Sequence, residues 1–563
     1  MSFVSHNSAR LTAIAALALL AALACALYLP YLGNPAVFDD KLFFSGLGFS
    51  RYASSPFGLG NRVPAYFSLA IVEVVFGRIE AHRVVSLVLH IACAWAVYAL
   101  IRALQVRRLA AFAGAALFAV HPVAVYGAGY LVQRSILLAT LFGLLSLVLY
   151  LRGLRRGSYS DALAAAVLYS LAVLSKEHAV LLPAAAAVLV ALADATRRFA
   201  LRYTALYFLA CAPAAVLVVL LSKGIIGQAY EPYFDVVAAQ MTNAYWSEIV
   251  SSPWVGNAIA QVTLFFKYLA LWLAPSTADM SLDVRVDFAE HWSPAIALPA
   301  LFGFFGWAAL AAYLVTKRGR VGIAAFGLLY VWILFFTEFA SIRFQEPFVL
   351  YRSYLWAPGL AVAVAAGLEF LQARVMLALL IPALAVLGWQ AHDRLNSFSS
   401  GLAIWEDAAA KLPPDAIPGG HRPLYEVGRE YLYADRVEDA LQATDRCMKL
   451  YPATFDCFYA RGAIHIELKQ YEKALPYTLR AITLRPNEGI ARHRLGLILE
   501  NLGCLDDAMA QYRLATTLRF EGAAYQLQRI ESPGMGLLPP VQPVAVKGDC
   551  ARLLIRKAVP RPG

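Results

Sequence analysis

The sequence predicts an all-α protein in two parts, a polytopic membrane helical bundle followed by a C-terminal α-solenoid. Three observations lead to this prediction: the composition, a series of long apolar runs, and small residues that recur every 34 residues near the C-terminus. Of the 563 residues 60% are hydrophobic and 15% are charged, and the mean hydropathy is +0.60. Soluble domains carry roughly 25% charged residues, so this composition is typical of a membrane protein.

Eleven apolar runs approach the length of about 20 residues that is needed to cross a bilayer. The first run, Leu11 to Leu32, is long and precedes many others, so we interpret it as a retained helix and not as a cleaved signal peptide. The other ten runs are 82–104, 109–126, 131–151, 161–175, 178–194, 202–222, 294–315, 321–337, 352–371 and 374–390.

Basic clusters orient these spans, because loops rich in Lys and Arg remain in the cytoplasm. Such clusters follow the second, fourth and sixth runs, at residues 102–108, 152–156 and 197–202. Residues 256–275 are also apolar, but counting them as a span would export the basic cluster at 317–320. Because they also contain Lys267, we expect an interfacial or re-entrant helix. The pattern predicts a multi-pass inner-membrane protein with a cytoplasmic N-terminus. The loops 33–81, 127–130, 176–177 and 223–293, and the C-terminal domain, then lie on the outer, periplasmic side.

The net charge of +11 could suggest nucleic acid as a partner, but these clusters account for much of it. No nucleic-acid motif accompanies them, and we expect no nucleic-acid partner. No Cys or His spacing of a zinc site occurs either.

Small residues recur in register every 34 residues beyond about residue 421, which is the period of tetratricopeptide repeats. The columns are Gly428, Gly462 and Gly496; Ala440, Ala474 and Ala508; Cys447, Ala481 and Ala515; and Pro452 with Pro486. We therefore expect a membrane domain at 1–392, a linker with a capping helix at 393–420, a tetratricopeptide domain of about three repeats at 421–530, and a Pro- and Gly-rich tail at 531–563.

An exported repeat domain would hold Cys447, Cys457, Cys504 and Cys550 in an oxidising compartment. Cys447 and Cys457 are each five residues from Pro452, on antiparallel helices that a short turn joins. This spacing favours a Cys447–Cys457 disulfide, and the alternative is two buried thiols at a helix interface.

An acidic pair, Asp39 and Asp40, follows the first span at the outer face. Two adjacent carboxylates there could bind a metal ion or accept a proton from a hydroxyl, and we place Asp40 ahead of Asp39 as the base. The alternative is a solvated loop or a helix N-cap.

Further ionisable and polar residues lie at the outer ends of later spans, which suggests a polar cavity. Basic side chains there, Arg134, Lys176 and Arg352, suit a phosphate or diphosphate through charge-assisted hydrogen bonds. The remaining candidates are His121, Glu177, His178 and Tyr351. The alternative for any one of them is snorkelling at the interface, or a Lys176–Glu177 pair that only fastens a short loop.

These motifs resemble those of GT-C glycosyltransferases, in particular the TMTC-type O-mannosyltransferases and their bacterial relatives. The similar segments are the acidic pair, Leu117 to Pro122, Gln133 to Ser135, Leu174 to Glu177 and Tyr351 to Leu355. Gln133 and Tyr351 depart from the family residues, Gly and Glu. The resemblance implies a GT-C-like fold of about eleven to thirteen spans, a polyprenyl-phosphate-linked sugar as donor, and a base within the acidic pair. Some such enzymes need a divalent metal, and the sequence leaves this open.

The leading hypothesis is therefore a membrane glycosyltransferase that moves a sugar from a polyprenyl phosphate to an acceptor hydroxyl on a protein, which the repeats recruit. An oligosaccharide ligase that uses a polyprenyl-diphosphate glycan would need a similar basic cavity. A non-enzymatic scaffold would account for the repeats, but not for the acidic pair or the outward basic residues.

Overall fold

The computed structural model describes residues 2–44, 52–53, 60–229, 236–237 and 253–531. The chain divides into two compact units, Met1–Ile404 and Trp405–Gly563. The described residues are helical apart from loops and two isolated β-bridges, so the predicted all-α class is confirmed. The predicted tail beyond Glu531, with Cys550, lies outside the described residues.

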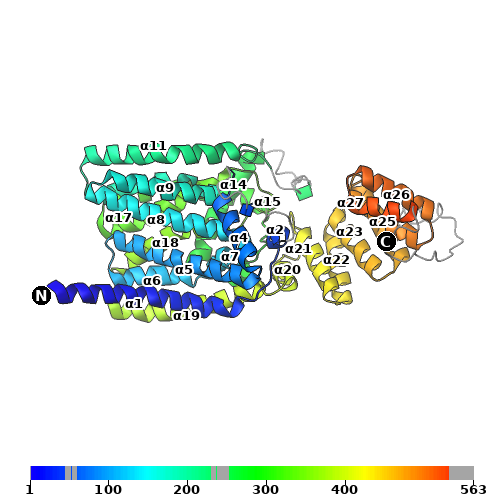
Figure 1. Ribbon diagram of the computed structural model, residues 1–563, viewed down its shortest axis with the longest axis horizontal. Helices are drawn as coiled ribbons and strands as arrows, with labels where there is room; N and C mark the ends of the chain where they lie inside the picture. The colour runs from blue at the N-terminus through cyan, green and yellow to red at the C-terminus, as the bar shows by residue number, and fades with distance from the viewer. Residues whose placement is uncertain (1, 45–51, 54–59, 230–235, 238–252, 532–563) are drawn as a thin grey trace. The chain divides into compact units, whose positions relative to one another are not determined.

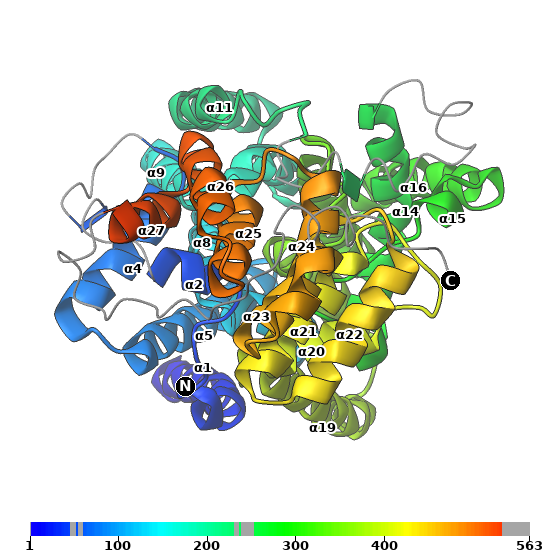
Figure 2. The same cartoon turned by 90° about the vertical axis from the view of Figure 1, so that its right-hand side faces the viewer.

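The first unit is a bundle of long helices that run alongside one another (Figure 1), and Figure 2 shows the same helices end-on. Its longer helices are α1 (Ser2–Tyr28), α5 (Ile79–Ala103), α6 (Arg108–Ala119), α8 (Arg134–Arg156), α9 (Tyr159–Ser175), α11 (Arg197–Leu221), α16 (Pro294–Val315), α17 (Gly319–Phe335), α18 (Ala357–Leu368) and α19 (Ala373–Ser397). Within the part of the chain that the structure describes, seven helices are long and apolar enough to cross a membrane, or eight if the bent pair Arg108–Ala119 and Pro122–Ala128 forms one span. Each predicted run contains helix, while the count of eleven spans stays a prediction.

Short helices follow the ends of these long helices. They are η1 (Leu29–Tyr31), α2 (Asp39–Phe44), α4 (Val63–Phe76), η2 (Pro122–Ala124), α7 (Val125–Ala128), η3 (Leu131–Gln133), η4 (Glu177–Leu181), α10 (Leu182–Val188), η5 (Leu189–Leu192), η6 (Thr277–Asp279), α15 (Phe288–Trp292), η7 (Phe336–Phe339) and η8 (Leu350–Leu355). The apolar helix α4 lies in a region that the sequence analysis treated as an outer loop. It packs against α8 and α9, and Val74, Val75 and Phe76 remain exposed on it.

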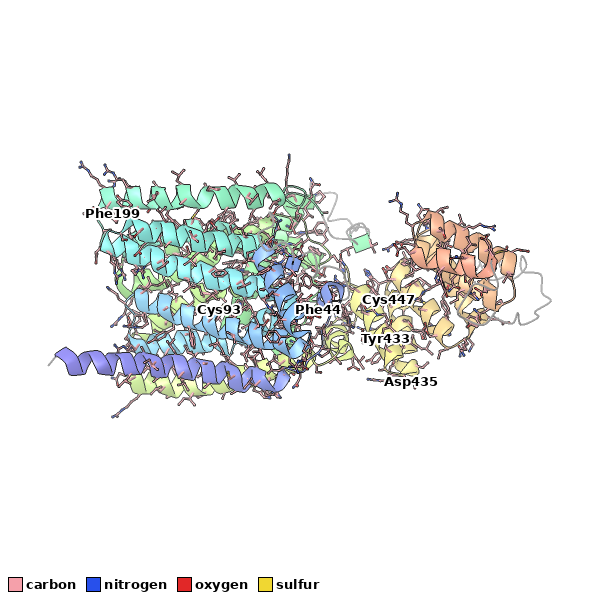
Figure 3. All side chains as sticks on the ribbon, viewed as in Figure 1. Phe44, Cys93, Phe199, Tyr433, Asp435 and Cys447 are labelled. Atoms are coloured by element: carbon pink, nitrogen blue, oxygen red, sulfur yellow. A yellow bond between two sulfur atoms is a disulfide. The ribbon has the colours of Figure 1, made fainter. Side chains whose placement is uncertain are left out.

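The basic clusters meet at one end of the bundle, which we name the basic end. A carboxylate oxygen of Glu369 accepts a hydrogen bond from the Arg107 N–H at 2.5 Å, and the other lies 3.3 Å from Arg320 Nε. The cluster at 317–320 therefore shares this end with the cluster at 102–108, as the sequence predicted. In Figure 3 Phe199 marks the basic end, Cys93 lies midway along the bundle, and Phe44 marks the opposite end, the site end.

The segment predicted to be interfacial or re-entrant forms α14 (Pro253–Leu273), which lies across the site end. Near its start, Asn257 Nδ2 donates to the Ser341 carbonyl at 3.0 Å. Near its end, Trp272 Nε1 donates to Ser353 Oγ at 2.8 Å. Both partners belong to the segment that joins α17 to α18, so α14 supports that segment along its length. It is not among the helices long and apolar enough to span a membrane.

The second unit stacks helix pairs with the predicted 34-residue period. After α20 (Gly401–Ala410) its helices are α21 (His421–Tyr433), α22 (Val437–Leu450), α23 (Phe455–Glu467), α24 (Tyr471–Leu484), α25 (Gly489–Asn501), α26 (Leu505–Thr517) and α27 (Glu521–Glu531). A Cβ added to Gly428, Gly462 or Gly496 would come within 3.1, 2.7 or 2.6 Å of a side chain on the paired helix. This is why the column contains only glycine.

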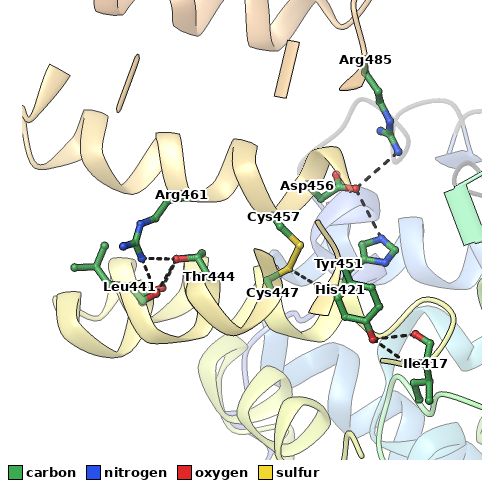
Figure 4. Close-up of a disulfide and its surroundings, with 11 residues drawn as sticks. Ile417, His421, Leu441, Thr444, Cys447, Tyr451, Asp456, Cys457, Arg461 and Arg485 are labelled. Carbon is green, nitrogen blue, oxygen red and sulfur yellow. Dashed lines mark hydrogen bonds and ion pairs between the residues drawn. A yellow bond between two sulfur atoms is a disulfide. The ribbon is translucent and has the colours of Figure 1, made fainter. Parts of the chain in front are cut away.

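A disulfide joins consecutive repeats in this unit (Figure 4). Cys447 on α22 and Cys457 on α23 are bonded, with their α-carbons 5.5 Å apart, so the predicted pairing is confirmed. Cys504 is also disulfide-bonded. The free cysteines of the described residues, Cys25, Cys93 and Cys211, all lie in the bundle.

Candidate active site

Polar side chains from four separate segments gather at the site end. These segments are α2, the residues just before α4, the bend between α9 and η4, and the segment from η7 to η8. Phe38 and Arg62, which precede α2 and α4, have φ values of +51° and +65°. This left-handed conformation is uncommon for residues other than glycine, and it is often found at functional sites. Here it turns the chain so that a helix starts at the next residue.

Asp40 is fully buried and caps a neighbouring helical turn. Its Oδ1 accepts a hydrogen bond from the Val132 N–H at 2.8 Å, and its Oδ2 accepts one from the Leu131 N–H at 3.3 Å. Burial raises the pKa of Asp40 to about 7, although the Val132 hydrogen bond and the charge of Arg83 act in the opposite direction. This carboxylate holds α2 against η3. It does not line either of the two cavities described below, one of which is bordered by Asp39 and the other by Arg62.

Asp39 is only partly buried, and it does line a cavity. Its backbone N–H donates to Tyr130 Oη at 3.1 Å, which fixes the start of α2. We name this small space the acidic cavity. Its lining residues are Phe38, Asp39, Tyr130, Leu282, Asp283, Val284, Glu346, Phe348, Val349 and Tyr351. Its volume is about 10 Å³, and of the acidic pair Asp39 lines it and Asp40 does not.

Arg134 and His121 are buried among backbone groups. The Arg134 guanidinium donates to the carbonyls of Ser68 and His82, both at 2.9 Å, and so ties α4 and α5 to α8. His121 Nδ1 accepts from the Val123 N–H at 3.2 Å, and its Nε2 lies 3.1 Å from the Trp272 carbonyl. The ring therefore caps η2 and fastens it to α14. Arg134 lines neither site cavity, and these contacts favour a structural role for both residues.

The bend between α9 and η4 brings three ionisable residues to the site. Glu177 receives two hydrogen bonds from Arg62, at 3.1 Å from Nε and 2.5 Å from Nη2. Lys176 is 2% exposed, and its Nζ lies 5.6 Å from the centre of the Tyr351 ring. Burial, and next the charge of Arg62, lower the pKa of Lys176 to about 7. Glu177, Glu338 and Asp39 act in the opposite direction, so Lys176 lies within the electrostatic reach of both Asp39 and the Arg62 side of the site.

A fully buried carboxylate, Glu338, lies among cations from other segments. Its Oε2 accepts a hydrogen bond from Arg343 Nη2 at 2.6 Å and lies 3.4 Å from Arg352 Nη1. Its Oε1 lies 3.7 Å from His178 Nε2. Glu338 thus connects η7 to η8 and to the bend after α9.

A second cavity, the basic cavity, has a volume of about 140 Å³ and opens beside α11. It is lined by Arg62, Glu177, His178, Val180, Val218, Val219, Ser222, Ile225, Ile226, Thr337, Ala340, Ser341 and Arg352. The lining therefore combines charged and apolar side chains. Tyr351 lines the acidic cavity and Arg352 the basic cavity, so the two cavities meet at adjacent residues, with Lys176 beside them.

The structure brings together most of the predicted site residues. Asp39, Lys176, Glu177, His178, Tyr351 and Arg352 gather around the two cavities, whereas Asp40, His121 and Arg134 line neither of them, and His121 lines a separate, mostly apolar cavity of about 480 Å³. Among the residues that the structure describes, no group of three or more His, Cys, Asp or Glu side chains could hold a metal ion.

Sequence reasoning missed Arg62, Glu338 and Arg343. Glu338 and Arg343 were detectable, because they are ionisable residues just beyond a predicted span, the same signal that selected Arg352. Arg62 is one of several charged residues in a long outer loop, and only its pairing with Glu177 distinguishes it.

Two segments of the chain match known protein families. Residues 62–222 match the family described as dolichyl-phosphate-mannose-protein mannosyltransferase, and residues 455–488 match the tetratricopeptide repeat. They confirm the predicted resemblance to GT-C glycosyltransferases with C-terminal repeats, and they support a membrane glycosyltransferase. The first match includes Arg62, Arg134 and the Lys176 bend, but not Asp39 or Arg352.

The chain is also similar to the apo crystal structure of the Archaeoglobus fulgidus oligosaccharyltransferase. The two share 13% identity with a TM-score of 0.40 over 74% of this chain and 59% of that protein. This chain therefore spans about three fifths of that protein's length. No curated protein matches it.

Proposed function

We propose that the bundle transfers a sugar from a polyprenyl phosphate to a hydroxyl group of a protein acceptor at the outer face of the membrane. The observation that carries this proposal is the basic cavity of about 140 Å³, which is lined both by Arg62, His178 and Arg352 and by the apolar side chains Val218, Val219 and Ile226. A polyprenyl phosphate has the same two-sided chemistry, with a charged head and an apolar chain. Leu209, Val216 and Leu220 of α11 are exposed towards the bilayer, which supports entry of the lipid from the side.

The basic side chains of the basic cavity suit a phosphate. Arg62 and Arg352 both line the cavity, where Arg62 pairs with Glu177 and Arg352 lies 3.4 Å from Glu338. Guanidinium groups form charge-assisted hydrogen bonds with phosphate oxygens. We assign Arg62, Lys176 and Arg352 to the donor phosphate.

Asp39 is the base in this proposal, because it faces the acidic cavity and Asp40 does not. The acceptor oxygen attacks the anomeric carbon of the donor while its proton passes to the Asp39 carboxylate. The bond between the anomeric carbon and the phosphate oxygen breaks, and its electron pair leaves with the phosphate. The basic side chains stabilise the charge that develops on that oxygen. Lys176, which interacts electrostatically with Asp39, would lie beside the reacting bond.

The repeats are proposed to hold the protein acceptor on the outer side. Two observations support this side. Asn34 Nδ2 donates to the Leu395 carbonyl at 3.0 Å, so α19 ends at the site end, just before the second unit begins. The Cys447–Cys457 disulfide also suits an oxidising compartment such as the periplasm.

Reconstituted protein tests the proposal directly. Proteoliposomes that contain polyprenyl-phosphate sugars and a mixture of envelope proteins should yield glycosylated protein with the wild type and none with Asp39→Asn, as measured by intact-protein mass spectrometry. Transfer from polyprenyl-diphosphate glycans alone would instead favour the oligosaccharide ligase. If neither donor is used and neither carrier lipid binds, the scaffold hypothesis is favoured.

A further inference from the structure

We propose that Glu338 is a positioning residue that holds the phosphate-binding face of Arg352 towards the basic cavity. This inference rests on the proposed function, because it assigns Glu338 a role in the binding of the donor phosphate. Glu338 does not line the cavity itself, although its neighbours Thr337 and Ser341 do. Its carboxylate lies close to Arg343, Arg352 and His178.

The contacts of Glu338 join η7 to the residues that follow it, up to η8. Its Oε2 is shared between Arg343 at 2.6 Å and Arg352 at 3.4 Å, and Arg343 Nη2 also donates to the Glu338 carbonyl at 2.9 Å. Arg343 is thus fixed to η7 by two hydrogen bonds. Arg352, at the longer distance, keeps its place on the wall of the basic cavity.

Electrostatics explains why a carboxylate is needed at this position. Arg343, Arg352 and Glu338 are 1%, 6% and 0% exposed in their side chains, so water screens their charges poorly. Without Glu338, Arg343 and Arg352 would lose the carboxylate that they share, and the repulsion between these two buried guanidinium groups would increase. A shared carboxylate allows the cations to remain clustered in the empty site, and it leaves enough positive charge to attract a phosphate.

The second carboxylate oxygen of Glu338, Oε1, lies near His178. Oε1 makes no hydrogen bond, and it lies 3.7 Å from Nε2 of His178, which lines the basic cavity. A small shift of the imidazole would bring it within hydrogen-bond distance. Glu338 therefore lies next to two residues that line the cavity, Arg352 and His178.

The test compares the binding of a polyprenyl phosphate with the binding of the uncharged polyprenol to the full-length protein in lipid nanodiscs. Glu338→Gln keeps the volume and removes the charge, so we expect at least tenfold weaker binding of polyprenyl phosphate and unchanged binding of polyprenol. A structural collapse would weaken both. Glu338→Asp should recover most of the affinity. Glu369→Gln, which changes an ion-paired carboxylate at the basic end, is the matched control and should bind both lipids as the wild type does.

A second variant covers the case in which Glu338→Gln fails to fold. The double variant Glu338→Gln with Arg343→Gln removes one charge of each sign from the buried cluster, and it should show the same selective loss. Wild-type affinity for polyprenyl phosphate in either variant would overturn the positioning role and leave the proposed function standing. If the wild-type protein does not bind polyprenyl phosphate at all, both are rejected.

Discussion

The affinity for the donor should fall between pH 7 and pH 9 because of Lys176. Its buried ammonium group has a pKa lowered to about 7, so the free site loses this positive charge as the pH rises through neutrality. A bound phosphate stabilises the charged lysine and raises its pKa. Binding above pH 7 therefore requires the uptake of a proton, and the dissociation constant must increase with pH. The polyprenyl phosphate used as the probe is a monoester with a second pKa near 6, so it remains a dianion over this range, and the sugar-linked donor, a phosphodiester, carries one negative charge throughout.

The size of the effect follows from the same pKa. Half of the lysine is charged at pH 7 and about one tenth at pH 8, so the dissociation constant should rise about fivefold over that unit. The increase in the dissociation constant must level off once Lys176 is neutral and its charged contact with the phosphate is lost. A hydrogen bond to a charged group contributes about 1.5–3 kcal/mol, so the total change should be about 10- to 150-fold.

Titration of a fluorescent polyprenyl phosphate into the protein in nanodiscs measures this dependence. Lys176→Arg is the matched control, because guanidinium stays protonated throughout and its curve should be flat. Asp40, whose pKa is raised to about 7, titrates equally in both proteins, so the difference between the curves isolates Lys176. A wild-type affinity that does not change from pH 7 to pH 9 would refute the assignment of Lys176 to the phosphate.

The remaining predictions separate catalytic from structural residues. Asp39→Asn should reduce transfer at least 100-fold, because the carboxamide cannot accept a proton, without changing the melting temperature. Asp40→Asn should instead destabilise the bundle by about 1–3 kcal/mol, because the Leu131 or Val132 N–H loses its acceptor. Arg134→Lys should lower the melting temperature, since it breaks the contacts to Ser68 and His82, and leave the donor affinity unchanged. Cys447→Ala with Cys457→Ala should destabilise the repeat domain by about 2–3 kcal/mol.

Each of these predictions has an outcome that contradicts it. Full transfer by Asp39→Asn, with none by Asp40→Asn at unchanged stability, would return the base to Asp40. Donor binding that is lost in Arg134→Lys without any loss of stability would restore that arginine to the phosphate site. Free thiols at Cys447 and Cys457 in protein purified from the envelope would weaken the case for an outer repeat domain, and a cytoplasmic reporter fusion at Gly420 would reject it.

Much of the architecture could be predicted because it depends on residue patterns that recur over short distances in the sequence. The small residues that recur every 34 residues predicted that paired helices approach closely. Gly496 is an example, because a Cβ at this position would be 2.6 Å from the Tyr512 ring. The spacing about Pro452 likewise predicted the disulfide. By contrast, α4 escaped prediction, because its apolar stretch is only 14 residues long and contains Glu73.

The roles of the site residues could be predicted less well, because the position of a residue along the chain does not determine which groups its side chain contacts in the folded protein. Arg134 and Arg352 both lie near the outer end of a predicted span, and no sequence pattern separates them. The structure separates them through their partners. Arg134 is surrounded by backbone carbonyls of α4 and α5, which cannot be exchanged for a ligand without opening those helices. Arg352 shares a side-chain carboxylate at 3.4 Å and borders a cavity, so it can contact a phosphate without any loss of helix packing.

The same reasoning explains why the acidic pair divides its roles. A base must reach a bound hydroxyl, and the turn at Phe38, with φ +51°, directs consecutive residues to different surroundings. Asp40 enters the packing against η3, where two backbone N–H groups satisfy its oxygens, and Asp39 is left at the edge of the acidic cavity. If this division is correct, Asp40 is needed to hold Asp39 in place. Asp40→Asn should then lower the transfer rate only as far as it loosens α2. Lower temperature or a stabilising lipid should recover the activity of Asp40→Asn, and neither should recover that of Asp39→Asn.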